Sequence, residues 1–191
     1  MCLETAVKKI PTLFDRDWTG DRSRVIATVN PPCQWVIDGE GVATRKIDGA
    51  CARVLDGALY KRRELRQGEA APVGFELADH DDETGKTVGW MPVGEGPEDR
   101  WFREAFARLQ DAADGTYELL GPKVQGNPEG LADHVLSPHD TATLAFAPQP
   151  PRDFEGLKAW MAGQDIEGVV WHHPDGRRAK LKLRDFGLTR G

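Results

Sequence analysis

The sequence predicts an α+β fold, in which antiparallel sheets carry most of the chain and two helices pack outside them. Between Gln34 and Arg63, short alternating apolar runs are separated by three Asp-Gly pairs, which are typical of tight β-hairpin turns. Two segments, at 97–113 and 153–163, have the apolar spacing of amphipathic helices. The length of 191 residues suits one domain with a sizeable core. We therefore expect a single domain over residues 1–191, with no appended C-terminal domain.

Strands dominate the expected first third of the chain. A strand at Val25–Val29 ends before Pro31-Pro32. An antiparallel meander follows, with expected strands at 35–37, 42–47, 50–55 and 58–60. The turns between them would be Asp38-Gly39, Asp48-Gly49 and Asp56-Gly57.

The middle of the chain combines a loop region with the clearest helix. Residues 67–96 are rich in Gly, Pro and acidic residues, and we expect a loop with one or two short strands. The acidic run at 79–83 favours a solvated loop over a metal site, because consecutive residues do not converge on one face. The helix at 97–113 begins with Pro97 and has an apolar stripe, and Gly115 would end it.

The last third alternates strands with one helix. Strands are expected at 116–121 and 142–147, and the helix at 153–163 follows them. The runs 168–172 and 179–184 would form a hairpin around Pro174-Asp175-Gly176. A period of two in its second strand places Lys180, Lys182 and Arg184 on one face.

Composition and charge limit the classes of function. With 39% hydrophobic and 29% charged residues, no apolar run near 18 residues and no signal peptide, the chain reads as soluble and cytoplasmic, without a membrane partner. The net charge is −6, yet residues 173–191 hold six Arg or Lys against two Asp. A second basic cluster contains Lys61, Arg62, Arg63 and Arg66. Basic sites on an acidic body favour a polyanionic substrate that is bound locally.

Cysteine and histidine usage gives no metal or disulfide signature. The chain has an odd number of cysteines, and these are widely spaced at Cys2, Cys33 and Cys51. The five histidines do not show the spacing of metal ligands. The pattern therefore argues against a disulfide framework and a zinc site, and it fits a reducing compartment.

Lys46 and Asp48 form the candidate centre of the chain, in the run K-I-D-G. Two residues apart in a strand, they would leave the same face. An amine crowded by other cations can lose its proton and act as a nucleophile. Such a run also occurs in ordinary hairpins with an exposed lysine, so its meaning depends on other residues.

Other charged residues would complete a site for nucleotidyl transfer. Attack on an α-phosphorus requires cations for the phosphates, a divalent metal, and carboxylates for the metal and the ribose. The chain offers Glu118, Glu167, Lys180 and Lys182 on separate expected strands or their ends. Taken singly, these residues could equally be an edge carboxylate, a loop charge and a solvated strand face.

The order of four short motifs favours a site for nucleotidyl transfer over unrelated surface charges. K-I-D-G at 46–49, Y-E-L-L-G at 117–121, E-G-V-V at 167–170 and K-L-K at 180–182 resemble motifs I, III, IV and V of the covalent nucleotidyltransferase superfamily of polynucleotide ligases and capping enzymes. The longer strings E-L-L-G-P-K-V-Q-G-N-P and E-G-V-V-W-H resemble the ATP-dependent RNA ligases, in particular the group that includes the human 5′-to-3′ RNA ligase. The resemblance covers residues 34–184 and implies a nucleotidyltransferase domain that cradles ATP.

The resemblance also implies a role for each residue. Lys46 would form lysyl-AMP, while Asp48 and Glu167 would position Mg²⁺, with Mn²⁺ as a substitute. Glu118 would bind the ribose hydroxyls, and Lys180 and Lys182 would contact the phosphates. The backbone around Arg45 would lie near adenine. An arginine after motif I usually contacts the ribose or phosphate, and the sequence leaves Arg62, Arg63 and Arg53 as alternatives.

We therefore expect an ATP- and Mg²⁺-dependent RNA ligase that joins 5′-phosphate and 3′-hydroxyl RNA ends, with a monomer favoured. Few residues follow Lys182, and this argues against DNA joining and capping, because both depend on a further domain. Two alternatives stay open. One is another lysine-dependent nucleotidyltransferase, either a DNA nick ligase or a capping guanylyltransferase, and the other is a non-catalytic module that binds RNA ends.

Overall fold

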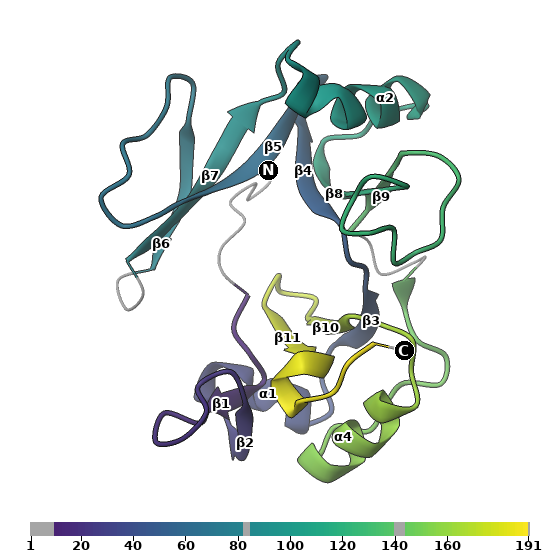
Figure 1. Cartoon of the computed structure of the whole chain (residues 1–191). Coiled ribbons are helices and arrows are strands. Elements are labelled where there is room, and N and C mark those ends of the chain that lie inside the picture. The colour runs from purple at the N-terminus through teal and green to yellow at the C-terminus, as the bar shows by residue number, and fades with distance from the viewer. Residues whose placement is uncertain (1–9, 82–84, 140–143, 191) are drawn as a thin grey trace. The chain divides into compact units, whose positions relative to one another are not determined.

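The computed structural model describes residues 10–81, 85–139 and 144–190. The chain forms two compact units. Of the described residues, the first unit contains 48–81 and 85–139, and the second contains 10–47 and 144–190. The chain passes from one unit to the other after Ile47 and after His139. Figure 1 labels the α-helices and strands of each unit.

A six-stranded antiparallel sheet is the framework of the first unit. Across the sheet the strands follow in the order β6 (Glu76–Asp81), β7 (Lys86–Pro92), β5 (Ala58–Leu65), β4 (Ala50–Leu55), β8 (Gly115–Leu120) and β9 (Val135–Pro138). The short helix η2 (Pro97–Asp99) leads into α2 (Arg100–Arg108), which packs on one face of this sheet.

The two faces of this sheet differ because residues alternate along each strand. On one face, Ala52, Val54 and Leu59 pack with Tyr117, Leu119 and Ala105 of α2 to form the core. Residues opposite one another in an antiparallel ladder share a face. Cys51 lies opposite Glu118, so both lie on the face away from this core.

The second unit contains a three-stranded antiparallel sheet in the order β11 (Arg178–Lys182), β10 (Gly168–His172) and β3 (Val42–Lys46). A two-stranded sheet joins β1 (Phe14–Arg16) to β2 (Val25–Val29). The helical elements are η1 (Pro31–Cys33), α1 (Gln34–Ile37), α4 (Phe154–Ala162) and η3 (Leu183–Phe186). Trp171, Leu181 and Leu13 form its core with Leu157 and Met161 of α4.

The helix α4 forms where the sequence predicts it. The Asp153 side chain accepts a hydrogen bond from the Gly156 amide at 2.8 Å, which satisfies one free N–H of the first turn. Leu157 and Met161, four residues apart, lie on one face and are completely buried. Gly163 occupies the C-cap position.

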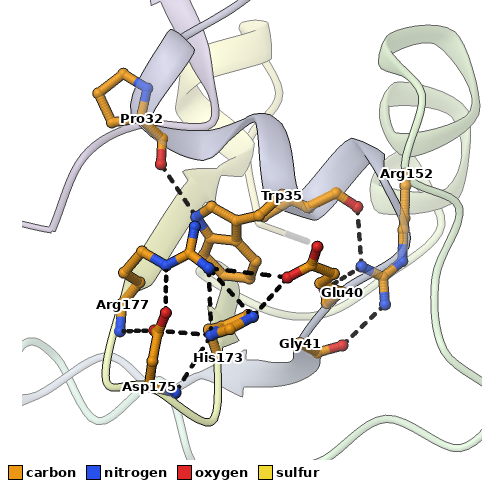
Figure 2. Close-up of polar contacts among 9 residues, drawn as sticks. Pro32, Trp35, Glu40, Gly41, Arg152, His173, Asp175 and Arg177 are labelled. Atoms are coloured by element: carbon orange, nitrogen blue, oxygen red, sulfur yellow. Dashed lines mark hydrogen bonds and ion pairs between the residues drawn. The ribbon is translucent and has the colours of Figure 1, made fainter.

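The segment 35–37 is helical, so the predicted strand is wrong. Trp35 is buried, and its indole N–H donates to the Pro32 carbonyl at 3.0 Å. The Trp35 ring meets the His173 ring edge-on with centroids 5.3 Å apart (Figure 2). Arg152 donates to the Val36 carbonyl at 2.9 Å. It also donates to the Gly41 carbonyl at 2.9 Å (Figure 2), and so closes the end of α1. These long-range contacts override the local strand pattern.

Only one of the three Asp-Gly pairs makes a hairpin. Asp56 and Gly57 have φ values of 50° and 74°, as a tight turn between β4 and β5 requires. Asp38-Gly39 instead follows α1. Asp48-Gly49 connects β3 of one sheet to β4 of another, so the predicted hairpin at this point is wrong.

Several element boundaries also differ from the prediction. The predicted helix 97–113 ends at Arg108, because Leu109 has an extended backbone. The last strand ends at Lys182, and Arg184 lies in η3 rather than on the lysine face. The region 67–96 contains the hairpin of β6 and β7, and part of the acidic run lies on β6. Of the predicted strand 142–147, residues 142 and 143 lie outside the described residues, and Ala145 forms an isolated bridge to Thr44.

The predicted α+β class with mostly antiparallel sheets is confirmed. Sequence reasoning missed β1 and β9 and found the remaining strands in whole or in part. Within the described residues, no helix is long and apolar enough to cross a membrane.

We predict that Leu119→Ala lowers the free energy of unfolding by about 2 to 5 kcal/mol, because it leaves a cavity in the first unit's core. Leu119 is 2% exposed, whereas Leu77 on β6 is 66% exposed. The matched variant Leu77→Ala should therefore cost less than about 0.5 kcal/mol. Urea denaturation followed by circular dichroism measures both, and equal losses would contradict this description of the core.

Candidate active site

The second unit brings Lys46 and Lys182 to the two sides of one strand. Lys46 on β3 lies opposite Gly168 on β10, and Gly168 lies opposite Lys182 on β11. All three therefore share a face of the sheet. A Cβ atom on Gly168 would approach the Leu181 carbonyl oxygen to 2.2 Å, so only glycine fits between the two lysine strands.

Glu167 joins the two lysines through both of its oxygens. Lys46 Nζ donates to Oε2 at 2.5 Å, and Lys182 Nζ donates to Oε1. The three side chains are 15% to 23% exposed, so the ion pairs are partly shielded from water. Burial raises the pKa of Glu167, but the two ammonium groups lower it more, and the pKa lies below its ordinary value. We call Lys46, Glu167 and Lys182 the lysine–glutamate cluster.

Lys180 lies on the same face of β11 as Lys182, two residues before it. It faces Val170 on β10, and its amide donates to the Pro11 carbonyl at 2.9 Å. Leu181, between the two lysines, is completely buried. The predicted division of this strand into a cationic face and a core face is thus confirmed for residues 180–182.

Thr44 and His172 continue this face, and sequence reasoning missed them. Thr44 is 1% exposed, and its hydroxyl donates to the Val170 carbonyl at 3.0 Å. His172 Nε2 lies 3.1 Å from the same hydroxyl. Both residues are at even offsets from Lys46 and Gly168 along their strands, which is the signal that could have identified them.

Arg45 lies on the opposite face of β3 from Lys46. Its guanidinium donates to the Asp165 carbonyl at 3.4 Å. Its backbone nevertheless belongs to the same strand as the nucleophile candidate. An adenine contact through the backbone near Arg45 stays a prediction.

Glu118 is the centre of a polar cluster in the first unit. It is 8% exposed, and Oε1 accepts a hydrogen bond from the Gly49 amide at 3.0 Å. Oε2 lies 2.9 Å from His139 Nε2. A Cβ atom on Gly49 would approach the Leu119 carbonyl oxygen to 2.2 Å, so the K-x-D-G glycine is needed for this close approach to β8.

The register separates the three candidate arginines. Arg53, opposite Tyr60 on β5, lies on the face of Glu118, and so does Arg62 two residues beyond Tyr60. Arg63 lies on the opposite face and pairs with Glu69 at 2.8 Å. The sequence predicts a basic cluster of Lys61, Arg62, Arg63 and Arg66. Lys61 pairs with buried Asp99, so these four cations do not form one surface.

Arg53 has a packing role in this sheet. It is 5% exposed, and its guanidinium lies over the Tyr60 and Trp90 rings at 4.4 and 5.0 Å. It also pairs with Glu76 at 2.5 Å. Arg62 is exposed on the same face and is the arginine best placed for a ligand.

The predicted site residues thus fall into two sets. The second unit brings together Lys46, Glu167 and Lys182, with Lys180 and Arg45 on the same sheet. Asp48, Glu118, Arg62 and Arg63 belong to the first unit. The boundary between the units falls inside the K-I-D-G motif, after Ile47.

Comparison with known proteins finds similarity to RNA ligases. Residues 97–190 match the family model described as RNA ligase 1. This range contains Glu118, Glu167, Lys180 and Lys182, whereas Lys46 and Asp48 precede it.

Three curated proteins named RNA ligase 1 are similar to the chain. The Danio rerio protein is 35% identical over 88 residues, which cover 42% of this chain and 26% of that protein. The proteins of Mus musculus and Pongo abelii are 30% and 29% identical over 141 and 140 residues, which cover 56% of this chain and 42% of each relative. The chain therefore matches less than half the length of these relatives. The resemblance to RNA ligases is confirmed.

We predict that Glu167→Gln lowers the free energy of unfolding by about 1 to 3 kcal/mol near neutral pH, because two ammonium groups lose their shared counter-ion. The lowered pKa means that the carboxylate stabilises the fold above its unfolded-state pKa, and this contribution is lost as the pH falls through the folded-state value. The difference between wild type and Glu167→Gln should therefore shrink in acid. Urea denaturation at several pH values measures it, and a difference that grows in acid would contradict the ion pairing.

Proposed function

We propose that this chain is an ATP-dependent RNA ligase with a nucleotidyltransferase fold, which stores AMP on Lys46 and joins 5′-phosphate to 3′-hydroxyl RNA ends. The observation that carries the proposal is the lysine–glutamate cluster, in which residues of three ordered motifs meet on one sheet face. The similarity to proteins named RNA ligase 1 supports RNA as the substrate.

The reaction would have three steps. Lys46 Nζ attacks the α-phosphorus of ATP, a P–N bond forms, and the bond to the β-phosphate oxygen breaks to release pyrophosphate. The 5′-phosphate of an RNA then attacks the same phosphorus and takes AMP from the lysine. Finally, a 3′-hydroxyl attacks the activated 5′-phosphate, which seals the strand and releases AMP.

The cluster suits the first step. Lys46 must lose a proton before its lone pair can attack, and Glu167 Oε2 lies 2.5 Å from its Nζ. The same contact fixes the direction of the amine. Lys182 reaches the other oxygen of Glu167, so a second cation lies beside the nucleophile, where phosphate charge would be stabilised.

The other residues would bind the nucleotide. Lys180 would add positive charge for the phosphates on the face of Lys182. Glu118, held by the Gly49 amide, would accept hydrogen bonds from the ribose hydroxyls. Arg62 would contact the ribose or phosphate, since it shares the face of Glu118.

Mg²⁺ is the metal that the resemblance implies. Glu167 fits it in charge and chemistry, because its lowered pKa keeps the carboxylate ionised and Mg²⁺ prefers oxygen ligands. Both oxygens hold ammonium groups, so an ion there would share or replace these contacts. We expect Glu167 and Asp48 to hold the ion, with Mn²⁺ as a substitute. When bound, it would neutralise charge on the phosphates.

We predict that incubation with α-labelled ATP and Mg²⁺ attaches one adenylyl group to the protein, and that Lys46→Ala abolishes the label. Intact-mass measurement and peptide mapping identify the modified residue. The matched control is Lys158→Ala, which removes an exposed lysine on α4 and should keep the label. Label that persists in Lys46→Ala would overturn the mechanism. Labelling by GTP, or joining of DNA but not RNA, would favour the alternative nucleotidyltransferases.

We predict that Arg62→Ala raises the ATP concentration for half-maximal labelling by about 10-fold, as expected when one charged contact to the nucleotide is lost. Arg63→Ala should have the smaller effect, because Arg63 lies on the opposite face of β5. Titration of ATP in the labelling reaction measures both variants. A larger effect of Arg63→Ala would contradict the assignment of faces.

A further inference from the structure

A second cluster of potential metal ligands lies in the first unit. Single ligand atoms of Cys51, Glu118 and His139 all lie within 4.8 Å of one another. A thiol, an imidazole and a carboxylate are the donor types that bind Zn²⁺. The three residues are far apart in the chain, so sequence spacing gave no sign of this group.

The sheet register explains why they converge. Cys51 on β4 lies directly opposite Glu118 on β8. Glu118 lies opposite Ser137 on β9, and His139 comes two residues later, which keeps it on the same side. Two ligands therefore come from the adjacent strands β4 and β8, and the third comes from the residue that directly follows β9.

The hydrogen bonds orient two of these ligands. His139 Nδ1 lies 3.1 Å from the Thr116 hydroxyl, and Nε2 lies 2.9 Å from Glu118 Oε2. The Gly49 amide holds the other carboxylate oxygen at 3.0 Å. Metal-binding histidines usually use the second ring nitrogen for such a contact, which fixes the ring. The Nε2 and Oε2 atoms thus already face each other.

We propose that Cys51, Glu118 and His139 form a binding site for Zn²⁺ or a similar thiophilic divalent metal. Cys51 would lose its thiol proton to solvent, and Sγ, Nε2 and Oε2 would provide three ligands. With zinc bonds of about 2.0 to 2.3 Å, ligand atoms lie about 3 to 4 Å apart. A separation near the 4.8 Å limit would therefore shorten by about 1 Å, and the Nε2–Oε2 distance of 2.9 Å would widen slightly. Solvent would fill the fourth position.

This site has a consequence that rests on the proposed function. Glu118 is the proposed ligand of the nucleotide ribose, and Oε2 cannot serve the metal and a ribose hydroxyl equally well. Zinc bound there would therefore inhibit formation of lysyl-AMP. Mg²⁺ would not replace it, because a thiolate is a poor ligand for that ion.

Cobalt titration of the tag-free full-length protein tests the site without any nucleotide. We expect a cobalt–thiolate charge-transfer band that Zn²⁺ removes. Cys51→Ser should abolish the band, and His139→Asn should weaken Co²⁺ binding by about 10-fold or more. The controls Cys2→Ser and His80→Asn should retain both the band and the affinity. Absence of the band in wild type, or its retention in Cys51→Ser, would overturn the proposal.

A second measurement uses only the wild-type protein, so it stands even if a variant fails to fold. Alkylation of Cys51, followed by peptide mass spectrometry, should slow by about 10-fold or more when Zn²⁺ is bound. An unchanged alkylation rate at saturating Zn²⁺ would overturn the site.

The link to catalysis is tested separately with free zinc held by a metal buffer. Zinc should reduce adenylyl labelling of wild type, and Cys51→Ser should be less sensitive when each protein is compared with its own zinc-free rate. Equal sensitivity would overturn the inhibitory link. If no adenylyl label forms while the cobalt band appears, the proposed ligase function fails and the metal site stands.

Discussion

The arrangement of the second unit depends on one carboxylate shared by two lysines from different strands. Glu167 precedes the central strand, and the strands on either side carry Lys46 and Lys182. Without that carboxylate, two ammonium groups would share a partly buried space without a counter-ion, which is unfavourable. Gly168 keeps the space between them open, because any larger residue would collide with the Leu181 backbone. Residues of the three motifs therefore form one cluster in space, although Lys46 and Glu167 are 121 positions apart in the sequence.

In both units, the alternation of residues along a strand places core side chains on one face and charged side chains on the other. In the second unit, Leu181 is buried in the core while Lys180 and Lys182 lie on the other face. In the first unit, Tyr117 and Leu119 enter the core while Glu118 lies on the polar face. A one-residue shift of either strand would exchange the two sets, so the cores that stabilise each sheet also fix which charged groups meet.

The sequence could predict those parts of the fold and site that depend on local pattern. The alternation of residues 180–182, the helix α4 with Asp153 as its cap, and the Asp56-Gly57 turn all follow from neighbouring residues. The helical conformation at Trp35 could not be predicted in this way, since it depends on contacts with His173 and Arg152 that are distant in the chain.

The hairpin predicted at Asp48-Gly49 is wrong because strand pairing there also depends on distant residues. Its local signal is the same as that of Asp56-Gly57, but β3 pairs with β10 and the chain enters another sheet. The choice among Arg53, Arg62 and Arg63 also required the register of β4 and β5.

The same reasoning explains why ligand spacing along the chain is a poor guide to metal sites in antiparallel sheets. Motifs such as C-x-x-C detect ligands from one turn or loop, where neighbours in sequence are neighbours in space. Cys51, Glu118 and His139 are brought together by cross-strand register instead, which has no fixed spacing. The first unit thus gives Glu118 the Gly49 amide on Oε1 and the His139 imidazole on Oε2. The Cys51 thiol lies within 4.8 Å of one of these oxygens. The amide satisfies one oxygen whatever is bound. In the proposed site, competition between a ribose hydroxyl and a thiophilic metal would therefore concern Oε2, and Cys51 would favour the metal.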